Sequence, residues 1–273
     1  MNDRSAVIAP LTDWSLAIRP RARIGHTIEV HETIGSTNDR ARELLDEDGG
    51  EGGVVLAEEQ TAGRGRRGRS WMSPAGVNLT LSVALRPALA AADAWQLGLA
   101  TALATLEACL PATPRADLGL KWPNDVVDHE GGKVAGLLIE TMMSGDRLTG
   151  AVAGIGINVN WLAADMPAEI SGRATSLAAL SGADVDRVAL LDRLLDALDR
   201  EVAGIEAGRS PLRRYRAACL TIGQDVTVEA AAGLLHGRAI GLDETGSLLL
   251  QVPGGQVALS SGEVASVRPE APA

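Results

Sequence analysis

Residues Gln60 to Trp71 read QTAGRGRRGRSW, and four arginines and three glycines fill positions 63 to 69. Glycine lets the backbone approach a ligand closely, and arginine offers forked donors to carboxylates and phosphates. Like charges on a glycine-rich segment predict a mobile loop that becomes ordered when an anion neutralises it. A solvated basic loop and an RNA-contacting loop of the RGG type are alternatives that this stretch alone leaves open.

Two common nucleotide-binding patterns do not account for this arginine loop (residues 63–71). The GxxxxGK(S/T) pattern of the phosphate-binding P-loop is absent from the sequence. Residues 63–68 match GxGxxG, but no helical pattern follows them, which argues against a dinucleotide-binding fold.

A second polar segment, KWPND, covers Lys121 to Asp125 and ends a predicted strand. Pro123 forces Trp122 towards extended geometry, so Asn124 and Asp125 are expected in a strand-end loop that faces a ligand. Asn and Asp oxygens suit Mg²⁺, and a lysine offers a point charge to phosphate. An ordinary Pro-Asn-Asp turn is the alternative.

Two later segments place a lysine and glycines in predicted strands. Lys133 opens the apolar run KVAGLLIE, so its amine either reaches solvent or points into a pocket. Gly154 and Gly156 lie within GIGIN, where strand glycines mark either close approach of a ligand or tight packing between layers.

Apolar runs bounded by turn residues predict the secondary structure of the whole chain. Strands are expected at 27–32, 54–58, 77–85, 119–122, 133–140 and 148–159. Helices are expected after the N-cap candidates Ser36 and Thr37 and at 91–110, 185–205 and 212–219. Residues 1–25 are expected to be irregular or a short first helix. From about residue 220, short strands separated by glycine turns predict a small barrel.

Composition limits the possible partners and the compartment. The formal net charge is −10, which disfavours bulk binding to nucleic acid or to an anionic membrane. The N-terminus lacks a signal-peptide pattern, and the longest apolar stretch, near 95–110, is shorter than the roughly 20 residues of a membrane span. A cytoplasmic protein is therefore expected. Cys109 and Cys219 have no metal-ligand spacing and are expected to be buried thiols.

Five segments, in this order, resemble the bacterial biotin–protein ligase family: GSTN (35–38), QTAGRGRRGRSW (60–71), KWPND (121–125), GKVAGLLIE (132–140) and GIGIN (154–158). The resemblance runs from about residue 28 to the C-terminus. It implies an α+β fold with a class II synthetase-like catalytic domain at 1–218, a mixed β-sheet flanked by helices, and an SH3-like β-barrel at 219–273. Too few residues precede the catalytic part for a helix-turn-helix domain, so the resemblance is to monofunctional ligases, without DNA binding.

The family resemblance implies an ATP- and Mg²⁺-dependent reaction. Biotin and ATP form biotinyl-5'-AMP, and biotin then passes to a lysine of the biotin carboxyl carrier protein domain of an acyl-CoA carboxylase. A monomer is expected. A lipoate or octanoate protein ligase of the same fold is the alternative, and the arginine loop with the SH3-like tail favours biotin.

The resemblance also assigns roles to residues that match the family motifs. Biotin contacts are expected from Ser36, Thr37, Asn38, Gln60, Arg64, Gly65, Arg66 and Lys133. Nucleotide contacts are expected from Arg69, Trp71, Asn158 and Arg268, and metal contacts from Asn124 and Asp125. The expected catalytic residues are Arg66, Lys133 and Lys121.

Overall fold

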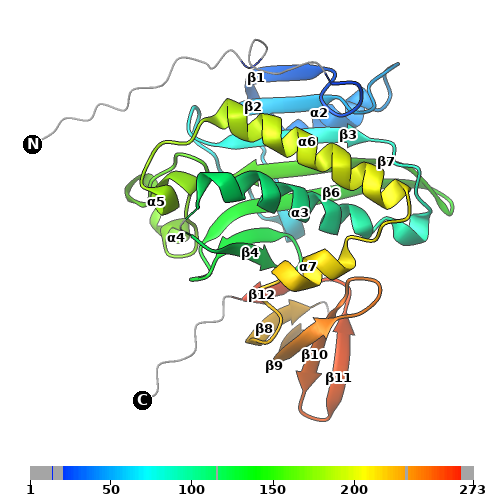
Figure 1. Ribbon diagram of the computed structural model, residues 1–273, viewed down its shortest axis with the longest axis vertical. Coiled ribbons are helices and arrows are strands. Elements are labelled where there is room, and N and C mark those ends of the chain that lie inside the picture. The colour runs from blue at the N-terminus through cyan, green and yellow to red at the C-terminus, as the bar shows by residue number, and fades with distance from the viewer. Residues whose placement is uncertain (1–13, 15–20, 115, 231–232, 266–273) are drawn as a thin grey trace, which may run out of the picture.

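The computed structural model describes Trp14 and residues 21–114, 116–230 and 233–265. Most of the segment expected to be irregular or a short helix at 1–25 lies outside these residues, and so does Arg268. The described chain forms a large sheet with helices and a small second sheet near the C-terminus (Figure 1).

The large sheet has seven strands in the order β1-β2-β3-β7-β6-β5-β4. Only β1 and β2 run parallel; the other neighbouring strands are antiparallel, so the sheet is mixed as expected. Its strands are β1 (Ile28–Ile34), β2 (Val54–Gln60), β3 (Leu79–Leu85), β4 (Leu118–Lys121), β5 (Asp125–Asp128), β6 (Lys133–Ser144) and β7 (Arg147–Ile157).

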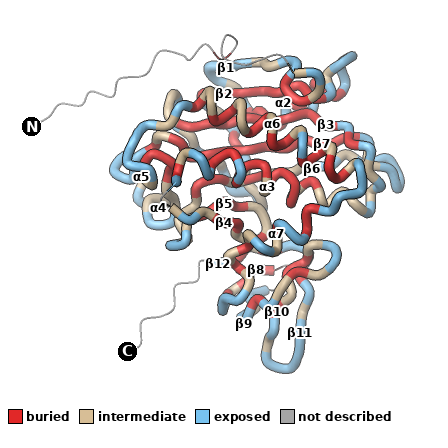
Figure 2. The backbone as a smooth tube through the Cα atoms, in the orientation of Figure 1, coloured by how far each residue is buried: buried red, intermediate tan, exposed pale blue. Residues whose placement is uncertain are grey.

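Helices α3 (Gln96–Cys109) and α6 (Arg187–Glu206) pack on each other and cover one face of this sheet (Figure 1). Asp186 starts α6 by accepting hydrogen bonds from the amides of Val188 and Ala189, which have no partner inside the helix. The apolar stripe of α6 and the strands beneath it are buried (Figure 2). No helix in the described part of the chain is long and apolar enough to span a membrane.

The opposite face of the sheet carries α2 (Thr37–Leu44), which packs on β2, β3 and β7. The strand alternation divides β3 between the two faces. Leu79 and Leu81 belong to the main core with α3 and α6, whereas Ala84 packs with Ala41 of α2. Thr80 and Ser82 therefore also face the α2 side, where the arginine loop lies.

A short helix, α7 (Leu212–Ala218), leads into the second sheet, whose five strands are all antiparallel in the order β11-β10-β9-β8-β12. They are β8 (Asp225–Ala230), β9 (Gly233–Leu242), β10 (Leu248–Val252), β11 (Gly255–Leu259) and β12 (Glu263–Ala265). The short strands expected after residue 220 are thus confirmed. Among the described residues, β11 and β12 form the two edges.

Two short helices, α4 (Ala168–Ser171) and α5 (Leu177–Ser181), lie in the connection from β7 to α6. One expectation was wrong in detail: Asp125 is not in a loop but is the first residue of β5, where it pairs with Lys121 across a hairpin. The turn is confined to 122–124, because the chain re-enters the ladder at once. This strand reads DVVD, and an aspartate stands at each of its ends. Because aspartate is common in turns, the sequence alone favours a turn here.

Candidate active site

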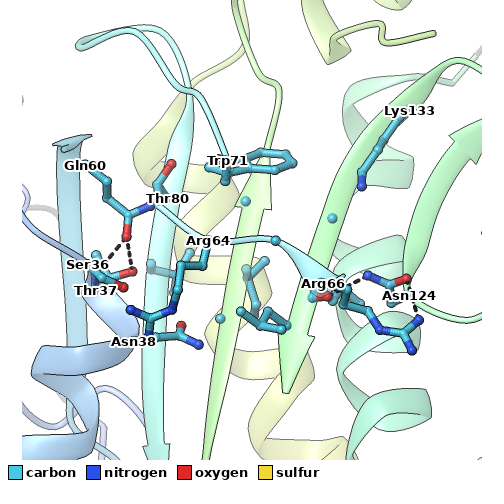
Figure 3. Close-up of a pocket in the computed structure, with 18 residues that line it drawn as sticks. Ser36, Thr37, Asn38, Gln60, Arg64, Arg66, Trp71, Thr80, Asn124 and Lys133 are labelled. Carbon is cyan, nitrogen blue, oxygen red and sulfur yellow. Dashed lines mark hydrogen bonds between the residues drawn. The ribbon is translucent and has the colours of Figure 1, made fainter. Parts of the chain in front are cut away.

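A cavity lies beneath the arginine loop on the α2 side of the large sheet (Figure 3). We call it the substrate cavity. It brings together most of the residues expected to bind ligands, namely Ser36, Thr37, Asn38, Gln60, Arg64, Gly65, Arg66, Trp71, Asn124 and Lys133. These residues come from α2, β2, the loop, the β4–β5 turn and β6, so the fold assembles segments that are far apart in sequence.

Uncharged polar side chains line one end of the substrate cavity, and the charge of Arg64 beside them is balanced by Asp39. The backbone N–H and the hydroxyl of Thr37 both donate to Oε1 of Gln60, at 2.7 and 3.0 Å. Because a backbone N–H is always a donor, this pair fixes the orientation of the Gln60 amide and turns its Nε2 group towards the cavity. Ser82 Oγ lies 2.8 Å from Thr37 Oγ1 and 2.6 Å from Asn38 Oδ1, and so supports both side chains from β3.

Glycines in β7 form the floor of this cavity. A Cβ added at Gly154 would lie 2.2 Å from Oδ1 of Asn38, and one at Gly156 would lie 2.3 Å from the indole of Trp71. Both distances are far below an ordinary contact between non-bonded heavy atoms. The strand glycines therefore mark a close approach, here of the two side chains that line the site.

Three of the four loop arginines are paired with carboxylates from other elements. Arg64 makes two hydrogen bonds to Asp39 at 2.6 and 2.7 Å, and this contact lowers the pKa of Asp39 below its usual range. The other two ion pairs reach the C-terminal sheet, from Arg67 to Glu229 at 2.9 Å and from Arg69 to Glu263 at 2.8 Å. The expected mobility of the loop stays a prediction, and these contacts hold the loop in its observed position.

Arg66 is the exception among the loop arginines, since it makes no ion pair within the described chain. Its guanidinium donates to Oδ1 of Asn124 at 3.3 Å and to the carbonyl of Gly262 at 3.4 Å. Burial lowers the pKa of Arg66, while the nearby Glu263 and Asp125 oppose this shift. A partly desolvated cation that faces the cavity is suited to receive an anionic ligand.

Lys133 lies at the same charged end of the cavity. Its Nζ is 2.7 Å from Oδ1 of Asp125 and 5.6 Å from the ring centre of Trp71. Asn124 is held by a 2.7 Å hydrogen bond from its Nδ2 to the carbonyl of Leu137, which turns its Oδ1 towards Arg66. The lysine thus points into the pocket, which was one of the two sequence-based alternatives.

The oxygens of Asn124 and Asp125 could hold Mg²⁺ only together with a phosphate ligand. Within the described residues, no group of three or more His, Cys, Asp or Glu side chains could form a metal site. Mg²⁺ commonly binds one or two protein oxygens and completes its shell with substrate phosphates and water. One buried carboxylate and one amide oxygen fit this mode.

Four candidates within the described residues lie outside the lining of the substrate cavity, namely Asp125, Lys121, Asn158 and Arg69. Lys121 borders a second cavity between the β4–β5 hairpin and the C-terminal sheet, and burial lowers its pKa although Asp125 opposes the shift. Asn158 is buried and donates to the carbonyl of Lys133 at 3.2 Å, so it supports the backbone of that lysine. Arg69 is half exposed.

Sequence reasoning missed Thr80, whose side chain lines the cavity from β3. The available signal was the alternation Leu79-Thr80-Leu81-Ser82, which places two small polar residues on one face of an otherwise apolar strand. A threonine is common in strands, so the residue type alone gave no reason to single it out.

Comparison with known proteins agrees with this arrangement. Residues 30–158 match the biotin/lipoate A/B protein ligase family, and residues 221–265 match the biotin protein ligase C terminal domain. The biotin–[acetyl-CoA-carboxylase] ligase of Mycobacterium tuberculosis is 38% identical over 98% of this chain and 100% of its own. That of Paracoccus denitrificans is 39% identical over 77% of this chain and 88% of its own.

A similar solved structure is that of biotin protein ligase from Aquifex aeolicus in complex with biotin and ATP. It is 32% identical, has a TM-score of 0.73, and the match covers 88% of this chain and 97% of that one. The similarity therefore extends over both sheets.

Proposed function

The chain belongs to the biotin/lipoate A/B protein ligase family, and we propose that it is a biotin protein ligase whose active site is the substrate cavity. It forms biotinyl-5'-AMP from biotin and ATP and transfers the biotin to a lysine of a carrier protein. The observation that carries this proposal is the polarity of the cavity. Gln60 and Thr37 form a neutral end for a ureido ring, and Arg66 and Lys133 form a cationic end for a carboxylate and phosphate.

In the first step a carboxylate oxygen of biotin attacks the α-phosphorus of ATP, and the bond from that phosphorus to the bridging oxygen of pyrophosphate breaks. Negative charge accumulates on the phosphate oxygens during this step. Arg66 and Lys133 lie where they offset that charge, at the end of the cavity that also holds Asn124. Asn124 and Asp125 would hold Mg²⁺ bound with ATP, which would supply further charge neutralisation.

In the second step the neutral amine of a carrier lysine attacks the carbonyl carbon of biotinyl-5'-AMP. The bond between that carbon and the phosphate oxygen breaks, AMP leaves, and the amine loses a proton. Until then the mixed anhydride must be protected from water. The arginine loop covers the cavity, and its contacts to Asp39, Glu229 and Glu263 hold it in place.

The test is ligand-dependent pyrophosphate release. The purified chain is supplied with ATP, Mg²⁺ and either biotin or lipoate, and carrier labelling is followed by mass spectrometry. We expect biotin-dependent release, one labelled carrier lysine, and loss of both in Arg66→Ala. The control Arg200→Ala, which removes an exposed arginine of α6, should retain activity. Activity with lipoate alone would show that biotin is not the substrate. Activity with neither compound would overturn the assignment as a ligase of this family.

The identity of the carrier as the biotin carboxyl carrier domain of an acyl-CoA carboxylase is part of this proposal, supported by the names of the relatives. The monomeric state, the lack of DNA binding, the cytoplasmic location and the domain division between residues 218 and 219 stay predictions. For DNA binding the relevant observation is the net charge of −10.

A further inference from the structure

The hydroxyl of Thr80 is buried without a hydrogen-bond partner in the described chain. The residue is 4% exposed, and its Oγ1 atom neither donates nor accepts a hydrogen bond. Buried hydroxyls are nearly always hydrogen-bonded, because removal from water without a new partner costs free energy. Its strand neighbour Ser82 shows the usual pattern, with contacts to both Thr37 and Asn38.

The position of Thr80 in the sheet explains why the protein offers it no partner. Its neighbours across the ladder are Ala57 on β2 and Gly156 on β7, and neither has a polar side chain. The residue lines the substrate cavity, and Figure 3 shows it between Gln60 and Trp71. A ligand in the cavity can therefore supply the missing hydrogen-bond partner.

We propose that the Thr80 hydroxyl is a further substrate contact, which hydrogen-bonds the neutral bicyclic head of biotin. This inference rests on the proposed function. Arg66 and Lys133 lie at the other end of the cavity and suit the carboxylate and the phosphate. A hydroxyl both donates and accepts, so it can serve the ureido group or, more weakly, the thioether sulfur.

Replacing Thr80 by Val separates substrate binding from a packing role. Valine keeps the branched shape and the strand preference of threonine but removes the hydroxyl. Because this hydroxyl has no partner in the ligand-free chain, its removal should not lower stability. A substrate contact thus predicts opposite effects, weaker binding of biotin and a ligand-free protein that is as stable as before or more stable.

Thr101→Val is the matched control. Thr101 is equally buried, but it lies in α3 on the other face of the sheet, and its hydroxyl donates to the carbonyl of Leu97 at 2.7 Å. Its loss removes a hydrogen bond inside a helix. We expect a lower Tm and unchanged KM values for biotin and ATP.

The experiment measures the KM for biotin, the KM for ATP and the ligand-free Tm of both variants. For Thr80→Val we expect the KM for biotin to rise about fivefold, the effect of one lost hydrogen bond, with the KM for ATP unchanged and Tm equal or higher. Desthiobiotin, which lacks the sulfur, then identifies the atom. If Thr80→Val also raises the KM for desthiobiotin relative to the wild type, the contact is to the ureido group. If the two proteins have the same KM for desthiobiotin, the contact is to the sulfur.

An unchanged KM for biotin would overturn the inference. So would a rise in both KM values with a lower Tm, because this pattern means that Thr80 only supports the fold. A wild-type chain without biotin-dependent pyrophosphate release would instead overturn the proposed function, and the role of Thr80 with it.

Discussion

A methyl group added at Gly156 tests whether the indole of Trp71 belongs to the nucleotide site. The new Cβ would lie 2.3, 2.4 and 2.7 Å from three atoms of that ring, Cε2, Cζ2 and Nε1. Gly156 sits in the middle of the sheet, between β3 and β6, so its backbone cannot retreat. It has an ordinary strand conformation, and alanine brings no backbone strain. The indole must therefore leave its place.

The size of the effect follows from the overlap. Carbon atoms pack at about 3.5–4.0 Å, so the ring must lift by roughly 1 Å. Extra methyl groups in well-packed sites cost about 1–3 kcal/mol, which is roughly a 5- to 150-fold change in an equilibrium constant. Trp71 is carried by a surface loop, so we expect this cost to destabilise the observed position of the loop and not the folded chain.

We expect Gly156→Ala to raise the KM for ATP within this range, to affect the KM for biotin less, and to leave Tm nearly unchanged. The rate of pyrophosphate release at saturating biotin, measured over a range of ATP concentrations, gives the KM for ATP. Gly98→Ala is the control: a Cβ at Gly98 of α3 meets no atom within 4 Å, and alanine favours a helix. A Gly156→Ala variant with the wild-type KM for ATP would show that Trp71 does not contact the nucleotide.

Three further predictions concern other parts of the molecule. Gly154→Ala should raise the KM for biotin more than that for ATP, because its Cβ would displace Asn38; equal effects would contradict this separation. Glu58→Gln removes the charge that faces the buried Arg187 at 2.7 Å, and should lower stability by roughly 3 kcal/mol, or Tm by roughly 6–12 °C. Glu107→Gln, which breaks the exposed ion pair with Arg200, should hardly change Tm. An equal fall in Tm in the Glu58→Gln and Glu107→Gln variants would refute the role of burial. Burial raises the pKa of Cys109 to about 12 and also raises that of Cys219, so at pH 8 both thiols stay protonated. A thiol reagent should then react rapidly with neither cysteine in the folded chain and with both after denaturation.

Much of the fold was predictable because the strands and helices of this chain have clear apolar patterns. The strand at β3 and the helix at α6 were expected within about two residues of their observed bounds, since long periodic segments leave little ambiguity. The β5 strand was not expected. Its four residues gain their strand conformation from pairing with β4 and β6, which is a tertiary effect that four letters do not reveal.

The substrate cavity was predictable only in part. Residues in unusual local sequence, such as Arg66 in the loop and Lys133 at the start of an apolar strand, could be singled out. Thr80 could not, because its role depends on which residues face it across the sheet. The ion pairs of the loop were equally hidden, since Glu229 and Glu263 lie about 160 and 190 residues further along the chain.

These ion pairs also explain how a strongly acidic protein can present a basic loop to an anionic substrate. Asp39, Glu229 and Glu263 neutralise three of its arginines, and they come from α2, β8 and β12. Repulsion within the loop is thereby reduced without help from a ligand. Arg66 makes no ion pair in the described chain, and its guanidinium donates to the uncharged oxygens of Asn124 and Gly262. The positive charge of the loop that no carboxylate pairs is thus concentrated at Arg66. In the proposed function, the arginines that hold the loop therefore differ from the one that binds the anion.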